Sequence, residues 1–150
     1  MKYTFACELP LFVEIACSSQ AIQKVSLAPA DKRGIELLIT PSSFSQKILD
    51  WMYAFSQKKP LSLNLPFDFT AFSPFTVQIM EKIKAIPFGE VASYGEVCSN
   101  APRAVGRICR FNPFPLFYPC HRVVRKGNVG GFAYGTPLKE KLLSFEDFRR

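Results

Sequence analysis

The chain has 150 residues, of which 48% are hydrophobic and 21% are charged. It contains 15 Phe, 12 Pro and 8 Gly, which is too aromatic for an intrinsically disordered chain and too poor in Pro and Gly for low complexity. The chain is therefore expected to fold, and its net charge of +7 indicates solubility, an acidic partner, or both.

The start of the chain does not have the apolar core of an export signal. Glu8, Pro10 and Glu14 interrupt the apolar residues there. No stretch approaches the roughly 20 apolar residues of a membrane span. The five cysteines form no Cys-x-x-Cys pair, which favours reduced thiols over a disulfide framework. We therefore expect a cytoplasmic protein with no membrane partner.

The first half of the chain has the pattern of a small sheet with one helix. Short β-branched or aromatic runs separated by turn residues predict an antiparallel sheet. Apolar residues at helical intervals then predict an amphipathic helix over residues 43–57. The predicted strands cover residues 3–8, 11–16, 21–27 and 35–39.

A connector over residues 58–72 leads into the second half, so we place domains at 1–70 and 71–150. Ser73 followed by Pro74 is typical of a helix start and predicts a helix that ends near Ala85. Residues 1–70 contain 7 basic and 6 acidic side chains, whereas residues 71–150 contain 12 and 6. The excess positive charge therefore belongs to the second domain.

Three arginines recur at helical spacing within that domain. Arg103, Arg107 and Arg110 fall on one helix face, with no acid between residues 103 and 126. A short helix over 94–99 and a turn over 100–102 precede them, which is the order of a helix-turn-helix. A solvated surface is the plain alternative, but arginine forks match phosphate oxygens, so we favour contact with DNA.

A thiol, an imidazole and a guanidinium follow one another at Cys120, His121 and Arg122. Cationic neighbours favour the thiolate, which makes a cysteine a usable nucleophile. A buried structural cysteine beside a surface histidine is the alternative. Pro119, which restricts the backbone before Cys120, and the basic helix upstream favour the nucleophile.

The segment from Pro119 to Val124, Pro-Cys-His-Arg-Val-Val, resembles the acceptor-site signature of the methylated-DNA-protein-cysteine methyltransferases. The resemblance covers roughly residues 72–147. It also includes Ile86 to Glu90, Arg103 to Gly106, Asn112-Pro113, Gly130 to Phe132, and Lys139 to Glu146.

The resemblance implies an α+β fold in which a ribonuclease-H-like sheet-plus-helix domain precedes a mostly helical, winged-helix-like domain. It also implies repair of O6-alkylguanine in duplex DNA by stoichiometric transfer of the alkyl group to Cys120, with base flipping and no cofactor. His121 would act through a water as the base for Cys120, and Glu146, on a closing helix over 137–146, would orient the imidazole.

The same resemblance assigns the DNA contacts and pocket residues. Arg103 would fill the space left by the flipped base, Tyr94 would assist flipping, and Asn112 would support the active-site loop. Arg107 and Arg110 would contact the DNA backbone. The substrate pocket would be formed by Cys120, Val124, Pro115, Phe132, Ala133 and Tyr134.

Three departures from the family pattern change these expectations. Only residues 95–102 separate Tyr94 from Arg103, so the first helix of the helix-turn-helix is short. Phe132 replaces a common Tyr, and Tyr134 replaces a small Gly, so we expect methyl to be preferred over benzyl. The histidine ligands of the zinc found in some relatives are missing, so we expect no metal.

Three other functions fit parts of the sequence. A lesion-binding module without transfer is one, although its relatives have Trp in place of the acceptor Cys. A helix-turn-helix regulator would need dimer symmetry, and the chain has no dimerisation segment, so we expect a monomer. A Cys-His hydrolase would show turnover.

Overall fold

A computed structural model describes residues 1–59 and 61–147. It divides into two compact units, Met1–Asp68 and Phe69–Arg150, and the predicted boundary between residues 70 and 71 lies slightly further along the chain. Pro60 of the predicted connector and residues 148–150 of the predicted second domain lie outside the described residues.

The first unit contains a four-stranded sheet with the order β1-β4-β2-β3. β1 pairs with β4 and β2 with β3 in antiparallel fashion, but β2 and β4 are parallel. The predicted all-antiparallel sheet is therefore wrong. β4 reverses direction after β3 as expected, yet it pairs on the far side of β2, whose direction it shares. The strands are Lys2–Phe5, Pro10–Cys17, Ile22–Pro29 and Gly34–Ile39; the predicted strand 3–8 ends earlier, because Cys7 and Glu8 form a bend.

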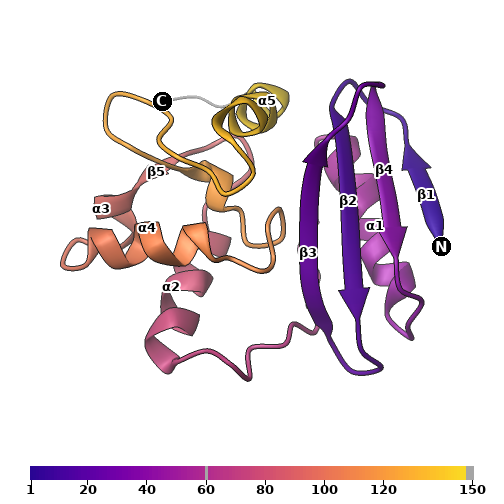
Figure 1. Cartoon of the computed structure of the whole chain (residues 1–150), viewed down its shortest axis with the longest axis horizontal. Coiled ribbons are helices and arrows are strands. Elements are labelled where there is room, and N and C mark those ends of the chain that lie inside the picture. Colours follow the sequence, from indigo (N-terminus) through magenta and orange to yellow (C-terminus); the bar gives the residue numbers. More distant parts are fainter. Residues whose placement is uncertain (60, 148–150) are drawn as a thin grey trace. The chain divides into compact units, whose positions relative to one another are not determined.

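Helix α1 (Ser45–Ser56) covers one face of this sheet (Figure 1). Its buried stripe contains Ile48, Met52 and Phe55, at the spacing that the sequence predicts. Alternate residues of β2 are buried as well, because successive strand side chains point to opposite faces. Helix and sheet thus share one apolar core.

The second unit consists of short helices around a two-stranded parallel ladder. α2 begins where the sequence predicts, with Ser73 Oγ accepting a hydrogen bond from the Thr76 amide at 3.2 Å. None of the helices in the described part of the chain is long and apolar enough to cross a membrane. The elements are α2 (Pro74–Lys84), β5 (Ala92–Ser93), α3 (Tyr94–Val97), α4 (Pro102–Arg110), η1 (Cys120–Arg122), β6 (Val123–Val124) and α5 (Thr136–Glu146).

The first helix of the expected helix-turn-helix is a single turn. α3 ends at Val97, earlier than the predicted 94–99, because Cys98 already has an extended backbone. A capping box holds the turn together: Ser93 Oγ accepts from the Glu96 amide at 3.1 Å, and Glu96 Oε1 accepts from the Ser93 amide at 2.8 Å. This box positions Tyr94.

Loss of the capping box tests its contribution. We expect Ser93→Ala to lower the free energy of unfolding by about 1 kcal/mol, because the Glu96 amide loses its acceptor. Urea unfolding followed by circular dichroism measures the change. Ser99→Ala, at an exposed position just after α3, is the matched control and should shift stability by less than about 0.5 kcal/mol. Equal losses for both variants would contradict the capping role.

Candidate functional site

Cys120 is held at the first position of η1, directly after Pro119. Its side chain is nearly enclosed, with 4% of the residue exposed. The amide of Cys120 donates to the Tyr118 carbonyl at 2.7 Å, and Sγ accepts a hydrogen bond from Asn112 Nδ2 at 3.2 Å. Both the backbone and the sulfur of Cys120 are therefore fixed.

Asn112 connects the end of α4 to this cysteine. Its Nδ2 also donates to the Tyr118 carbonyl at 2.8 Å, and its Oδ1 accepts from the Phe114 amide at 2.8 Å. The rings of Phe69, Phe114 and Tyr118 pack edge to face beneath the loop. The loop from Asn112 to Cys120 is thus supported by hydrogen bonds and by an aromatic cluster.

A buried polar network lies behind Cys120. His121 Nε2 and Glu146 Oε2 are 2.6 Å apart, and Arg122 forms two hydrogen bonds to the same carboxylate, at 2.8 and 3.1 Å. Arg122 also donates to the Ile86 carbonyl at 2.8 Å, and the Gly89 amide donates to Glu146 Oε1 at 3.3 Å. Glu146 therefore joins α5 to η1 and to the loop after α2.

The charges of this network determine the protonation state of His121. Burial raises the pKa of Glu146, but His121 and Arg122 outweigh it and lower the pKa to about 2. Burial lowers the pKa of His121, although Glu146 opposes that shift. A neutral imidazole beside a carboxylate donates from Nε2, so the lone pair is on Nδ1.

His121 Nδ1 is consequently available as a proton acceptor. It is buried and has no hydrogen-bond partner among residues 1–59 and 61–147. A buried polar atom without a partner is rare and marks a candidate functional group. His121 directly follows Cys120 in the chain, and an unprotonated imidazole nitrogen is a group that can act as a general base.

Two groups ease ionisation of the Cys120 thiol against the effect of its burial. Burial raises the pKa of Cys120, whereas the hydrogen bond from Asn112 and the charge of Lys139 lower it. Lys139 itself is buried, and its ammonium donates to the carbonyls of Val123 and Gly131 at 2.7 and 2.9 Å. Burial lowers the pKa of Lys139 to about 8, although Cys109 and Cys120 act in the opposite direction.

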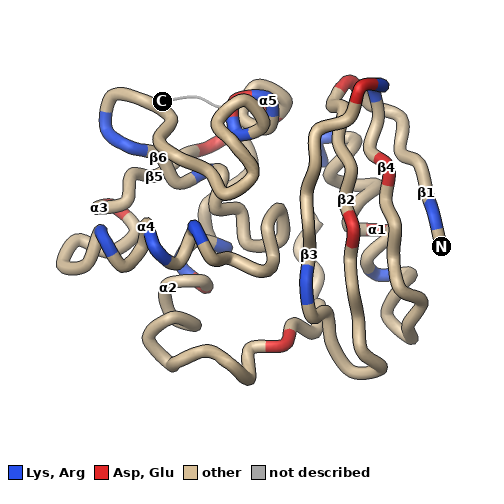
Figure 2. The backbone as a smooth tube through the Cα atoms, viewed as in Figure 1, with Lys and Arg blue, Asp and Glu red and all other residues tan. Residues whose placement is uncertain are grey.

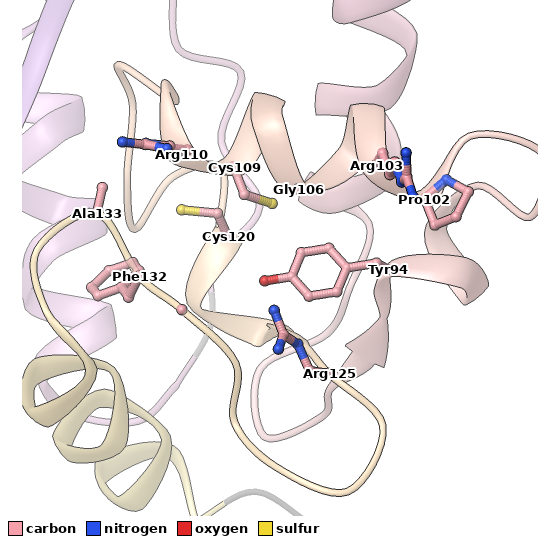
Figure 3. A pocket seen from close by; sticks show the side chains of 11 residues that line it. Tyr94, Pro102, Arg103, Gly106, Cys109, Arg110, Cys120, Arg125, Phe132 and Ala133 are labelled. Carbon is pink, nitrogen blue, oxygen red and sulfur yellow. The ribbon is translucent and has the colours of Figure 1, made fainter.

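An open cleft of about 740 Å³ lies beside the Cys120 sulfur (Figure 3). It is bounded by α3, by one side of α4 and by the segment that follows β6. The residues that line it are Tyr94, Pro102, Arg103, Gly106, Cys109, Arg110, Cys120, Arg125, Gly131, Phe132 and Ala133.

The cleft contains only part of the predicted site. His121, Glu146 and Asn112 are not among the residues that line it: Asn112 bonds to Cys120, and His121 bonds to Glu146. Three predicted substrate residues, Pro115, Val124 and Tyr134, are also outside its lining. Pro115 is buried in the loop between Asn112 and Cys120.

The three arginines of α4 divide between two hollows. Arg103 and Arg110 line the cleft, whereas Arg107 borders a smaller groove with Phe72, Phe75 and Phe111. Figure 2 shows basic residues along α4 and on the turn after β6. The exposed side of α4 is therefore basic next to the thiol.

Three residues of the site, Lys139, Cys109 and Arg125, were not assigned a role from the sequence, and Arg122 was considered only as a cationic neighbour of Cys120. Lys139 and Arg122 belong to the family motifs, but the partners of a buried cation are recognised only from the carbonyls or carboxylate around it. Cys109 lies in α4 and Arg125 directly follows β6, and both line the cleft. Their proximity depends on how these two elements pack together, which the sequence pattern does not show. Within residues 1–59 and 61–147, no three His, Cys, Asp or Glu side chains are grouped in a way that could hold a metal ion.

Residues 74–148 match the family model described as 6-O-methylguanine DNA methyltransferase, DNA binding domain. A methylated-DNA–protein-cysteine methyltransferase of Methanocaldococcus vulcanius is 42% identical over 81 residues, which is 52% of this chain and 50% of that protein. A DNA base-flipping protein of Thermus thermophilus is 40% identical over 96 residues, 61% of this chain and 65% of that protein. The chain thus spans about half the length of the methyltransferase relative.

Solved structures share the fold over most of the chain. The Mycobacterium tuberculosis OGT in complex with DNA superposes with a TM-score of 0.70 and 22% identity, covering 93% of each chain. The O6-methylguanine-DNA methyltransferase of Pyrococcus kodakaraensis has a TM-score of 0.63 and 22% identity, covering 91% of this chain and 98% of that one. These similarities confirm the α+β class.

The Glu146 network predicts a specific dependence of stability on pH. Since the folded-state pKa of Glu146 is about 2, below its ordinary 4.5, its stabilising contribution is complete above pH 4.5 and is lost as pH falls toward 2. Glu146→Gln should lose about 3–5 kcal/mol at pH 7, because Arg122 then keeps an uncompensated buried charge. It should also depend less on pH than the wild type in that window.

Urea unfolding at a series of pH values measures both effects. Glu140→Gln, on the exposed side of the same helix, is the matched control and should retain the wild-type pH profile. An unchanged slope between pH 4.5 and 2 in Glu146→Gln would contradict the assignment.

Proposed function

Because half of its length matches the family model, the chain belongs to the 6-O-methylguanine DNA methyltransferase family, and we propose that it repairs O6-alkylguanine in duplex DNA by transferring the alkyl group to Cys120. The family is the one expected from the Pro119 to Val124 motif. The observation that carries the proposal is a fixed thiol at the edge of a basic cleft, with an unpartnered imidazole nitrogen behind it.

The proposed reaction is a single displacement at the alkyl carbon. The thiol proton passes to His121 Nδ1 through a bridging water, and Sγ forms a bond to the alkyl carbon as the bond from that carbon to guanine O6 breaks. The imidazolium returns its proton through the water to the departing guanine, which neutralises the electron pair left on the base, restores guanine and leaves His121 neutral. Glu146 stabilises the imidazolium while it carries the proton. Each chain accepts one alkyl group and needs no cofactor.

The nearby charges favour the reaction at Cys120. The ammonium of Lys139 and the amide of Asn112 stabilise negative charge on the sulfur. Both groups are held by hydrogen bonds before substrate binds, so they need no reorganisation when the charge forms. Lys139 and Asn112 therefore act by positioning charge beside the reacting atom.

The substrate base must leave the duplex to reach Cys120, because its O6 is stacked within the helix. We assign Arg103 to the space that the base vacates and Tyr94 to the extruded nucleotide; both line the cleft. Arg107 and Arg110 are assigned to backbone phosphates. Backbone carbonyls of Cys120 and Val124 are assigned to the exocyclic amine of guanine, with Phe132 and Ala133 alongside the base.

We assign the finer features of the fold in the same way. α4 would be the recognition helix of a winged helix, and the first unit would have a ribonuclease-H-like fold. The acceptor thiol must stay reduced, which favours the cytoplasm. One acceptor site per chain is compatible with a monomer that acts on duplex DNA containing O6-alkylguanine.

A lesion-binding module is the second candidate, favoured by the similarity to a DNA base-flipping protein. The thiol of Cys120, with its base and its supporting amide, argues for transfer. A regulator would bind an unmodified sequence, and a hydrolase would turn over many times.

Intact mass after mixing the reduced protein with a duplex that contains one O6-methylguanine distinguishes these functions. We expect a gain of one methyl group per chain, mapped to Cys120 by peptide analysis. Cys120→Ala should gain none, while Cys109→Ala, which removes the other thiol of the cleft, should still be methylated at Cys120.

No mass gain combined with tighter binding of the lesion duplex would indicate the lesion-binding module. Methylation at Cys109, or more than one methyl per chain, would contradict the assignment of the acceptor.

The aromatic pair of Phe132 and Tyr134 predicts the alkyl preference. The two rings meet edge to face, with centroids 5.7 Å apart, next to the cleft. A bulky Tyr134 restrains the segment that a larger alkyl group must displace, so transfer from O6-benzylguanine in DNA should be slower than from O6-methylguanine. Tyr134→Gly should increase the benzyl rate relative to the methyl rate.

Single-turnover rates with the two duplexes measure the preference, and Tyr53→Gly, at an exposed aromatic position in the other unit, is the control for general effects of the substitution. Equal methyl and benzyl rates in the wild type would refute the proposed selectivity.

A further inference from the structure

The ladder between β5 and β6 determines which residues meet at the mouth of the cleft. These strands are parallel, with Ala92 opposite Val123 and Ser93 opposite Val124. The residues that directly follow the two strands are Tyr94, which begins α3, and Arg125. Since paired strands lie about 4.8 Å apart, the two residues leave the ladder as neighbours although they are distant in sequence.

Contacts around Gly130 show how close the two side chains are. A Cβ placed on Gly130 would lie 3.3 Å from the Tyr94 hydroxyl and 3.5 Å from Arg125 Cβ. Gly130 has φ +74°, a conformation that glycine adopts without strain. Both side chains line the cleft, and Figure 3 shows the guanidinium near the phenol. A side chain at position 130 would crowd the Tyr94 hydroxyl and the backbone nitrogen of Arg125, so the glycine leaves room for the pair.

The turn that carries Arg125 is held in place. The Asn128 amide donates to the Arg125 carbonyl at 3.2 Å, and Asn128 Oδ1 accepts from the Gly130 amide at 2.8 Å. Gly127, between Arg125 and Asn128 in the chain, has a φ of +87°. The guanidinium is thus presented by an ordered turn beside the cleft.

The pair offers hydrogen-bond donors without an acceptor of its own. Arg125 is exposed and forms no ion pair with any carboxylate in the described residues. Burial raises the pKa of the Tyr94 phenol, and although Arg125 opposes this shift, the hydroxyl stays protonated at neutral pH. A guanidinium fork and a hydroxyl that face one cavity suit a phosphate group.

We propose that Arg125 and Tyr94 form a clamp for a phosphate next to the flipped nucleotide, and that Arg125 is a positioning residue for alkyl transfer. The proposal rests on the proposed function. When a base rotates out of the duplex, the phosphates that flank it are drawn toward the cleft. Arg103 is on the α4 side of the cleft and Arg125 is on the β6 side, so the clamp fixes how deep the base enters toward Cys120.

The clamp acts on a phosphate and leaves the chemistry at sulfur unchanged. Loss of the clamp should therefore slow transfer from a substrate that has phosphates and should not slow transfer from one that has none. Arg125→Gln should slow transfer from an O6-methylguanine duplex by about 10- to 100-fold, the factor expected for a lost hydrogen bond to a charged group. Transfer from the free base O6-methylguanine, which has no phosphate, should keep its wild-type rate. Lys126→Gln, the adjacent exposed cation, is the control and should be near the wild type on both substrates.

Neutral phosphates locate the contact. Replacing each phosphate beside the lesion in turn by methylphosphonate should slow the wild type at one of the two positions. The same replacement should not slow Arg125→Gln further. The binding constant for DNA should also depend less steeply on salt in this variant. The magnitude of the slope of its logarithm against the logarithm of salt concentration should decrease by about 0.9, the change expected for one lost phosphate contact.

Three results would overturn the clamp. Arg125→Gln could slow the free base and the duplex equally, Lys126→Gln could match it, or methylphosphonate could slow the variant as much as the wild type. A wild type that transfers from neither substrate would reject the proposed function instead. In that case, DNA binding measured by fluorescence anisotropy in a Cys120→Ala background tests the clamp separately from alkyl transfer. Arg125→Gln must weaken binding of the lesion duplex more than binding of the unmodified duplex, or the clamp is rejected.

Discussion

The carboxylate of Glu146 is the group on which the site depends. It is enclosed, it carries a negative charge, and it is shared by three groups from two separate segments: an imidazole and a guanidinium from η1, and a backbone amide from the loop after α2. A buried carboxylate without these partners would be costly. The last helix must therefore end where it does, and η1 must turn directly beneath it. The orientation of His121, and with it the free Nδ1, is a result of this arrangement.

The second constraint acts from the opposite side of the thiol. Asn112 closes the loop that leads to Cys120, and aromatic rings support that loop from below. Two networks therefore act on the sulfur. The Glu146 network orients its proposed proton acceptor, and the Asn112 network ties the sulfur to the end of α4. Because the two networks come from different elements, the geometry at sulfur depends on the packing of the whole second unit.

The sequence predicted local features better than pairing partners. The helix start at Ser73-Pro74 and the apolar stripe of α1 depend on residues within one or two turns, so their spacing was sufficient. The Pro119 to Val124 motif likewise identified the family. The parallel pairing of β2 with β4 was missed, since alternation of apolar residues reports which face is buried and carries no information on strand order.

Some site residues required the fold for the same reason. Arg125 and Lys139 are ordinary basic residues in the sequence; one becomes relevant through the β5–β6 register and the other through two carbonyls that a separate segment supplies. Pro115, which the family resemblance assigns to the pocket wall, is buried in the loop between Asn112 and Cys120 and is absent from the residues that line the cleft.

The cleft is lined by a second thiol, that of Cys109, whose electrostatic environment differs from that of Cys120. Burial raises the pKa of Cys109, and the neighbouring Cys120 raises it further, while Asn112 donates only to Cys120. Negative charge on either sulfur disfavours negative charge on the other, so the two thiols compete for one ionisation. The amide of Asn112 distinguishes the two, because it favours negative charge on Cys120 alone. Under the proposed function, this difference would confine ionisation in the cleft to one of two chemically identical groups.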